Sequence, residues 1–282
     1  MVLGAGPGSD GSYMLETAQE LSKYGNVYII VQEIFRSRYQ KKDKINPKEH
    51  LDDLIIETSE DLLNFEQKNN LRNIITVGHC LMGFISLYYG EISDDVEKSI
   101  LVSTPVLPAN FSFKHKLKLL YLAFKNGFLK TMNDSETSKK VMLDFPLFSY
   151  DHYIHDKDKS IKRLQLFVDS LKDVNPYFIQ TFFKNKVRPC PDLSRLIPDI
   201  RKEKQEILYI EGGYEASVKK GEYELLKNHL EKIGYKNVRR EIIPDTKHFC
   251  FMENSEAFNR VIKSYLEDNI LNCLKKGDKF EL

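Results

Sequence analysis

Short β-prone runs alternate with amphipathic runs near both ends of the chain, and this alternation restricts the fold more than any other feature. Residues 47–65 show the second kind, with apolar side chains at helical spacing. Alternation of this kind is typical of a parallel sheet with helices on both faces. We therefore predict an α/β fold with a mostly parallel sheet. The β-prone runs are 2–3, 27–31, 73–77, 99–103, 207–210 and 238–243.

The alternation is interrupted between residues 105 and 204. This region has no strong strand candidate, but it has helical patterns at 117–128, 158–171 and 176–185. We expect 105–204 to be a helical cap inserted into a core formed by 1–104 and 205–282. Its aromatic residues are expected to form mainly the interior of the cap. They are Phe111, Phe113, Tyr121, Phe124, Phe128, Phe145, Phe148, Tyr150, Tyr153, Tyr177, Phe178, Phe182 and Phe183.

Cys80 lies between a β-prone run and a helical run, in the segment Gly78-His79-Cys80-Leu81-Met82-Gly83. A nucleophile in this position is held on a strained turn above the sheet, and the start of the following helix favours a thiolate. Gly78 and Gly83 would relieve crowding around such a turn. An isolated cysteine is more often a buried structural residue. The strand–turn–helix context nevertheless favours a nucleophile.

A cysteine nucleophile needs a base and a group that orients the base. His248 is the best candidate base, in the loop between the last β-prone run and the closing helix. Glu215 is the best orienting acid, just after the preceding β-prone run, with Glu211 and Asp245 as alternatives. In a parallel sheet, Cys80, Glu215 and His248 would all emerge at the carboxyl ends of strands. The order nucleophile, acid, histidine is that of α/β-hydrolases.

An oxyanion formed during acyl transfer needs hydrogen-bond donors. The amide of Leu81, directly after the nucleophile, is one candidate. The glycine-rich segment Gly4–Gly8 could supply a second amide, from Gly6 or Ala5. A dinucleotide fingerprint would require a further glycine that this segment lacks, so nucleotide binding is the weaker interpretation.

These motifs resemble the α/β-hydrolase superfamily, and within it the proline iminopeptidase-like branch. The segment 4–8 resembles the H-G-G-P-G oxyanion loop of that branch, and 78–83 is similar to G-H-S-x-G-G. The segment 213–215 looks like the G-x-Y-D acid segment, and His248, Phe249, Glu253 and 257–258 look like the G-H-F…E-P-E-A-F ending. The resemblance implies an α/β-hydrolase fold and a Cys80–His248–Glu215 triad that cleaves an ester, thioester or amide.

Several departures limit what the resemblance implies. Met82 occupies a glycine position of the G-x-S-x-G pattern, and the cysteine nucleophile is similar to that of dienelactone hydrolases or replaces a natural serine. The first two strands usual in the superfamily have no counterpart, and the segment 31–38 lacks most of D-Q-R-G-x-G-x-S. Prolyl specificity is therefore not inferred. An acyltransferase, a thioesterase and a catalytically silent binding protein stay open as alternatives.

The charge and cysteine content of the chain limit which partners and cofactors are expected. The net charge of +1 argues against electrostatic binding to nucleic acid or to an anionic membrane. The four cysteines form no metal-binding pair, and no cofactor is expected. The first eight residues do not resemble a signal peptide, so we expect a cytoplasmic protein and a chance origin for the retention-like ending 279–282. The expected partner is a small molecule or short peptide with an apolar part.

Overall fold

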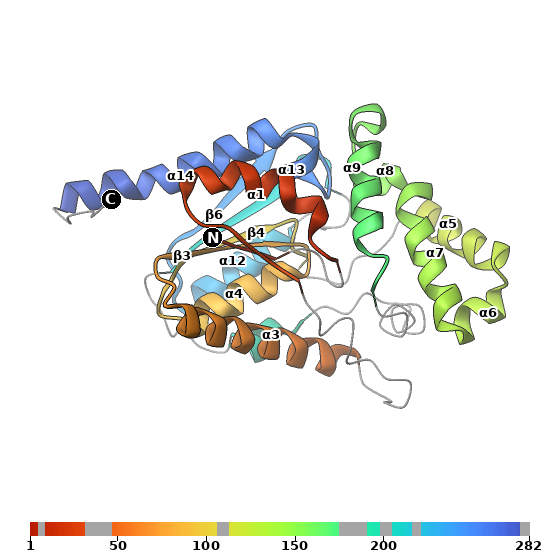
Figure 1. Cartoon of the computed structure of the whole chain (residues 1–282), viewed down its shortest axis with the longest axis horizontal. Coiled ribbons are helices and arrows are strands. Elements are labelled where there is room, and N and C mark those ends of the chain that lie inside the picture. Colours follow the sequence, from red (N-terminus) through yellow and green to blue (C-terminus); the bar gives the residue numbers. More distant parts are fainter. Residues whose placement is uncertain are drawn as a thin grey trace.

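The computed structural model of the chain describes residues 1–4, 9–31, 47–105, 113–174, 191–197, 205–215 and 221–276. Within these residues, the chain forms one sheet with helices on both faces and a further group of helices beside it (Figure 1). The helix expected at 176–185 lies outside the described residues.

The sheet has six strands in the order β2-β1-β3-β4-β5-β6, and every pair of neighbours is parallel. This confirms the predicted α/β fold. The crossover at β1 places the strand that precedes Cys80 next to the first strand of the chain. The strands are β1 (Val2–Gly4), β2 (Tyr28–Ile30), β3 (Ile74–His79), β4 (Val96–Val102), β5 (Glu206–Gly212) and β6 (Val238–Ile243).

Two hydrophobic cores cover the two faces of the sheet. Helices α3 and α4 pack with α12 on one face, whereas α1 and α14 pack on the other (Figure 1). Strand β4 contributes to both cores, because Leu101 belongs to the first and Ile100 and Val102 belong to the second. The helices are α1 (Leu15–Leu21), α3 (Pro47–Asn69), α4 (Met82–Ile92), α12 (Glu222–Lys232), α13 (Cys250–Glu253) and α14 (Ser255–Lys276).

The first helical segment begins with a turn formed by side chains and glycine. A short 3-10 helix (Ser12–Met14) precedes α1, and another (Ser22–Tyr24) follows it. Gly11 is the N-terminal flanking residue, with a left-handed φ of 78°. The carboxylate of Asp10 accepts a hydrogen bond from the backbone N–H of Ser12 at 2.9 Å. The side chain of Asp10 therefore satisfies the backbone N–H of Ser12, and the segment starts with an aspartate turn.

Between β4 and β5, the described chain is helical. The cap helices α5 to α9 form a group on one side of the sheet (Figure 1), and α11 follows separately. Helix α7, which the sequence analysis missed, begins where the carboxylate of Asp134 accepts a hydrogen bond from the N–H of Thr137 at 2.9 Å. The elements are α5 (Phe113–Lys125), α6 (Phe128–Asn133), α7 (Ser135–Phe148), α8 (Tyr150–Tyr153), α9 (Lys157–Ser170) and α11 (Leu193–Leu196).

The prediction of an aromatic cap interior is wrong for several residues. Phe145 is buried in a small cluster with Leu122 and Val141. This cluster is too small to enclose every aromatic side chain, and four of them lie on the surface instead. The four are Tyr121, Phe124, Phe128 and Phe148, with exposed fractions of 57%, 61%, 37% and 42%.

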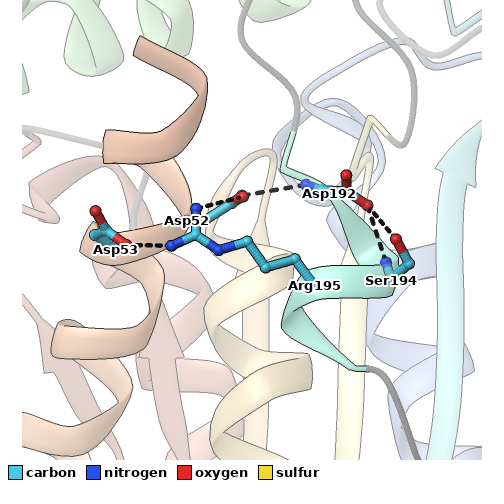
Figure 2. Close-up of polar contacts among 5 residues, drawn as sticks. All are labelled: Asp52, Asp53, Asp192, Ser194 and Arg195. Carbon is cyan, nitrogen blue, oxygen red and sulfur yellow. Dashed lines mark hydrogen bonds and ion pairs between the residues drawn. The ribbon is translucent and has the colours of Figure 1, made fainter. Parts of the chain in front are cut away.

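Helix α11 is held against α3 by a polar network (Figure 2). Arg195 contacts Asp53 at 2.7 Å and Asp52 at 3.5 Å. The buried carboxylate of Asp52 also accepts a hydrogen bond from the N–H of Asp192 at 3.1 Å, and the side chain of Asp192 caps α11 at Ser194. Because Asp52 is almost fully enclosed, its charge requires these partners, and the network determines where the chain re-enters the core.

Candidate active site

Cys80 occupies a strained turn between β3 and α4. Its φ of 57° lies in the left-handed region, which costs a non-glycine residue about 1 to 3 kcal/mol. The N–H of Cys80 donates to the carbonyl of Val102 at 2.8 Å, and the carbonyl of Cys80 accepts from the N–H of Gly83 at 3.1 Å. The neighbouring strand and the helix start therefore hold the strained conformation in place.

The glycines on either side of this turn are required by contact distances. A Cβ atom on Gly78 would lie 2.2 Å from the carbonyl oxygen of Met82. A Cβ atom on Gly83 would lie 1.9 Å from Oγ1 of Thr104. Both distances are well below van der Waals contact, so the expectation that Gly78 and Gly83 relieve crowding is confirmed.

Met82 departs from the usual elbow pattern, and its side chain is absorbed by the core. It is 1% exposed and packs with residues of β1, α3 and α4. A Cβ atom on Gly4 would lie 3.0 Å from the Cβ of Met82, so the glycine at the end of β1 makes room for the methionine. The methionine at position 82, where the pattern has glycine, therefore changes the packing under the turn and leaves the turn itself intact.

His248 lies after β6, with its ring between Glu215 and Cys80. Nδ1 of His248 is 3.3 Å from a carboxylate oxygen of Glu215, and both side chains are buried. The ring also forms a hydrogen bond with the side chain of Cys80, which leaves Nε2 as the nitrogen that faces the sulfur. The three predicted residues are thus brought together in the order cysteine, histidine, carboxylate.

The charge state of His248 follows from these neighbours. Burial of the ring lowers the pKa of His248, but Glu215 and Cys80 outweigh this effect and raise the pKa from 6.5 to about 9. An imidazolium at neutral pH is therefore favoured between a carboxylate and the cysteine sulfur. This arrangement is the one that stabilises a thiolate in cysteine enzymes.

Glu215 is the acid that contacts His248, and the two alternative carboxylates point elsewhere. Glu211 forms an ion pair with Arg240, and Asp245 lies exposed in a turn with a φ of 56°. The loop that carries Glu215 is tied to the loop of His248, because the N–H of Tyr214 donates to the carbonyl of Thr246 at 2.8 Å. The two loops therefore place acid and base together.

His79 is a residue of the site that the sequence analysis did not single out. Its buried ring contacts the carbonyl oxygen of His248 through Nε2 at 3.1 Å and the hydroxyl of Tyr13 through Nδ1 at 3.2 Å. A carbonyl oxygen only accepts, so Nε2 carries the proton and Nδ1 accepts from Tyr13. His79 therefore holds the main chain of the candidate base. Its position next to Cys80 was the available signal.

Glu253 connects the loop of His248 to the cap helices. One carboxylate oxygen accepts a hydrogen bond from the N–H of Lys247 at 2.7 Å, and the other accepts from the N–H of His155, between α8 and α9. Burial raises the pKa of Glu253 despite these backbone donors. The likeness of Glu253 to the family ending was a signal, but its bond to the cap was not predictable from that pattern.

Cys250 lies two residues after His248 but in a different environment from Cys80. Its side chain is fully buried, and burial followed by the charge of Glu215 raises the pKa of the Cys250 thiol well above its ordinary value. Cys250 is therefore held as a neutral thiol. The strained turn and the contact with His248 distinguish Cys80 from it.

The candidate oxyanion donors are only partly described. The N–H of Leu81 lies at the start of α4, where backbone N–H groups have no carbonyl partner four residues earlier in the helix. Ala5 and Gly6 lie outside the described residues. Among the residues that are described, no three or more His, Cys, Asp or Glu side chains are grouped as ligands for a metal ion.

No protein-family model and no curated protein matches the chain. Solved structures do match over nearly its whole length. One is an enol-lactonase from Burkholderia xenovorans, with a TM-score of 0.66, 15% identity, and coverage of 94% of this chain and 90% of that one. Another is an esterase from Exiguobacterium antarcticum, with a TM-score of 0.65, 17% identity, and coverage of 94% and 91%.

A third similar structure is 2-hydroxy-6-oxo-6-phenylhexa-2,4-dienoate hydrolase from a Rhodococcus strain, with a TM-score of 0.58, 14% identity, and coverage of 94% and 89%. The parallel sheet, the elbow at its carboxyl edge and these neighbours together define the class. The chain has the α/β-hydrolase fold.

Proposed function

We propose that the protein is a hydrolase that transfers an acyl group through a Cys80 thioester. The observation that carries the proposal is the placement of Cys80 and Glu215 on either side of one buried imidazole, that of His248. A nucleophile, a base and an orienting acid in hydrogen-bond reach are the arrangement that acyl transfer requires. The position of the three residues after the carboxyl ends of β3, β5 and β6 supports the proposal, because active sites of parallel α/β sheets gather there.

In this mechanism the Cys80 thiolate attacks the carbonyl carbon, and the electron pair of the C=O bond moves to the oxygen. The N–H of Leu81 would stabilise that oxyanion. When the tetrahedral intermediate collapses, the bond to the leaving group breaks and the proton of His248 moves to the departing oxygen, sulfur or nitrogen. Water then attacks the thioester, His248 takes its proton, and the sulfur of Cys80 leaves as a thiolate.

We further propose that residues 105–204 act as a cap that selects the substrate. The cap helices are tied to the loop of the base through Glu253, and Tyr153 of α8 places its ring 6.3 Å from that of His248. An aromatic ring beside the base favours an acyl group with an apolar part over a small, highly charged one. The proposed substrate is therefore a small ester, thioester or amide, or a short peptide, with such a group.

A series of p-nitrophenyl esters and thioesters of rising acyl length tests this proposal. We expect intact mass to reveal one added acyl group, peptide mapping to place it on Cys80, and Cys80→Ala to lose both acylation and turnover. Cys250→Ala is the matched control and should keep both. Acylation of Cys250, or full turnover in Cys80→Ala, would contradict the assignment, and a preference for acetyl over all longer groups would contradict the apolar pocket.

The same experiment separates the alternatives. An acyl-enzyme that persists in water but is consumed by an added amine or thiol identifies an acyltransferase. Failure of iodoacetamide and of every ester to modify Cys80 identifies a protein without this chemistry. The packing of Met82 under the turn removes one argument for such a silent protein, since the elbow accommodates that side chain.

A further inference from the structure

Helix α5 of the cap has two apolar faces, of which one is covered. Leu122 and Ala123 are buried against the rest of the cap. The opposite face consists of four apolar residues at the spacing i, i+3, i+4 and i+7, and their exposed fractions lie between 41% and 61%. They are Leu117, Leu120, Tyr121 and Phe124.

Neighbouring residues extend this face into a continuous patch. Phe124 stacks on Phe128 of α6 with ring centroids 5.1 Å apart, and Tyr121 stacks on Phe148 of α7 at 5.7 Å. Leu129, next to Phe128, is 76% exposed. The four residues of the α5 face together with Phe128, Leu129 and Phe148 form the outer cap patch. An exposed apolar area with several aromatic rings indicates an interaction site.

The segment that carries most of the outer cap patch is rich in lysine. Residues 113–130 contain five lysines and no aspartate or glutamate, although the whole chain has a net charge of only +1. Lys114 and Lys118 pair with Asp151 of α8. No ion pair within the described residues involves Lys116, Lys125 or Lys130, and all three are exposed. Each of these three lysines is adjacent in sequence to a patch residue, and together they add unpaired positive charge beside the patch.

We propose that the outer cap patch binds the surface of an anionic lipid bilayer. An amphipathic helix with an apolar face and a lysine-rich border lies in the interface plane, with its apolar side chains between the headgroups and its lysines at the phosphates. Helix α5 would lie on the bilayer. No helix of the described part of the chain has the length and apolar content needed to cross one.

The composition of the patch favours a lipid surface over a protein partner. Lysine is depleted in protein–protein interfaces, whereas a bilayer that contains anionic lipids attracts lysines wherever they lie around the apolar face. Aromatic rings occur at both kinds of interface, so the lysines are what distinguishes the two partners here. The expectation of no membrane partner rests on the charge averaged over the whole chain, whereas this proposal rests on the local excess of lysine.

The first test is co-sedimentation of the full chain with vesicles of phosphatidylcholine alone and of phosphatidylcholine mixed with phosphatidylglycerol. We expect binding to the mixed vesicles that weakens from about 0.1 M to about 1 M salt, because the screening length shortens from roughly 10 Å to 3 Å. Equal binding to both vesicles, or binding to neither, would overturn the proposal. Measuring Cys80→Ser alongside separates this result from the proposed chemistry, because vesicle binding does not require the thiol.

Two sets of substitutions test the residues. Lys116→Gln, Lys125→Gln and Lys130→Gln combined should weaken binding to mixed vesicles by roughly fivefold per lysine. The matched control combines Lys68→Gln, Lys232→Gln and Lys236→Gln, which remove three exposed lysines outside the cap. This control should change vesicle binding by no more than about twofold in total, because these lysines lie away from the patch. Equal losses of vesicle binding in the two sets would show that binding depends only on the total charge of the protein, and would overturn the proposal.

The apolar residues are tested by combining Leu117→Gln, Phe124→Gln and Leu129→Gln. All three are exposed, so the fold should tolerate the change while vesicle binding falls by more than about tenfold. The control combines Leu166→Gln and Leu225→Gln, which are exposed on α9 and α12. A dimer in sedimentation that the patch variant loses, without vesicle binding by either protein, would instead identify an interface between two copies.

Discussion

Nε2 of His79 lies 3.1 Å from the carbonyl oxygen of His248, so the residue before Cys80 holds the main chain of the candidate base. Because His79 ends β3 and His248 follows β6, this contact joins the end of one strand to the loop after another, on opposite sides of β4 and β5. Tyr13 fixes the other nitrogen of His79 from the first helical segment. His79 is therefore a positioning residue for the candidate triad.

Replacing His79 tests this relationship. His79→Phe keeps a ring of similar volume but leaves the carbonyl of His248 and the hydroxyl of Tyr13 without their partner. We expect a loss of about 2 to 6 kcal/mol in the free energy of unfolding, since each unsatisfied buried group costs about 1 to 3 kcal/mol. Urea unfolding measures it. Tyr13→Phe is the control because it removes only one of the two contacts, and an equal loss in both variants would contradict the role of His79.

Removing the base should affect activity more than stability. His248→Ala is expected to reduce turnover by roughly 10² to 10⁴, which is the usual contribution of a general base. Glu215→Gln should reduce it less, because an amide still accepts the hydrogen bond of the ring. His229→Ala on α12, whose ring contacts the carbonyl oxygen of Ile197 at 3.2 Å, is the control. Steady-state kinetics on the best ester measures these effects. Unchanged turnover in His248→Ala would contradict the proposed triad.

The raised pKa of His248 predicts how stability depends on pH. In the unfolded chain the imidazole titrates near 6.5, whereas in the folded chain the pKa is about 9. Between these values the folded imidazole holds a proton that the unfolded one has lost, so the contribution of His248 to the free energy of unfolding falls as pH rises. The stabilisation is complete below about pH 6.5 and is lost as pH passes through 9.

Chemical unfolding between these two pH values measures this slope. Glu215→Gln removes the carboxylate that raises the pKa of His248, so the slope of that variant should be shallower than that of the wild type. Glu256→Gln, at an exposed position paired with Arg260, should keep the wild-type slope. A slope in Glu215→Gln as steep as that of the wild type would contradict the assigned charge state.

Much of the fold was predictable because it depends on local patterns. Each strand contains a short β-prone run, and residue type, order and strand-end position were enough to select Cys80, His248 and Glu215. The roles of His79 and Glu253 were not predictable, because both side chains act on main-chain groups that are distant in sequence. Helical spacing also could not show which of the two apolar faces of α5 would be covered.

The elbow glycines make a prediction about packing. Gly78→Ala would place its Cβ 2.2 Å from the carbonyl oxygen of Met82, a main-chain atom that cannot move without displacing α4. We expect a loss of about 3 kcal/mol or more in the free energy of unfolding, at the upper end of overpacking effects. At Gly213 the nearest atom to an added Cβ is 3.5 Å away, so Gly213→Ala is the control. Thermal unfolding measures the stability of both variants. Equal stability of Gly78→Ala and Gly213→Ala would show that the turn is not crowded.

Glu253 should couple the cap to the base, because its two carboxylate oxygens accept from the N–H groups of Lys247 and His155. Glu253→Gln replaces one acceptor with an NH₂ group that faces a donor, so one of these two contacts must break. We expect faster hydrogen exchange at 153–156 or 246–249. We also expect the substitution to raise the KM for long-chain esters more than the KM for short-chain esters. Glu256→Gln, on the exposed side of α14, is the matched control and should leave both quantities unchanged. Unaltered exchange in both segments of Glu253→Gln would show that the cap and the base are held independently of each other.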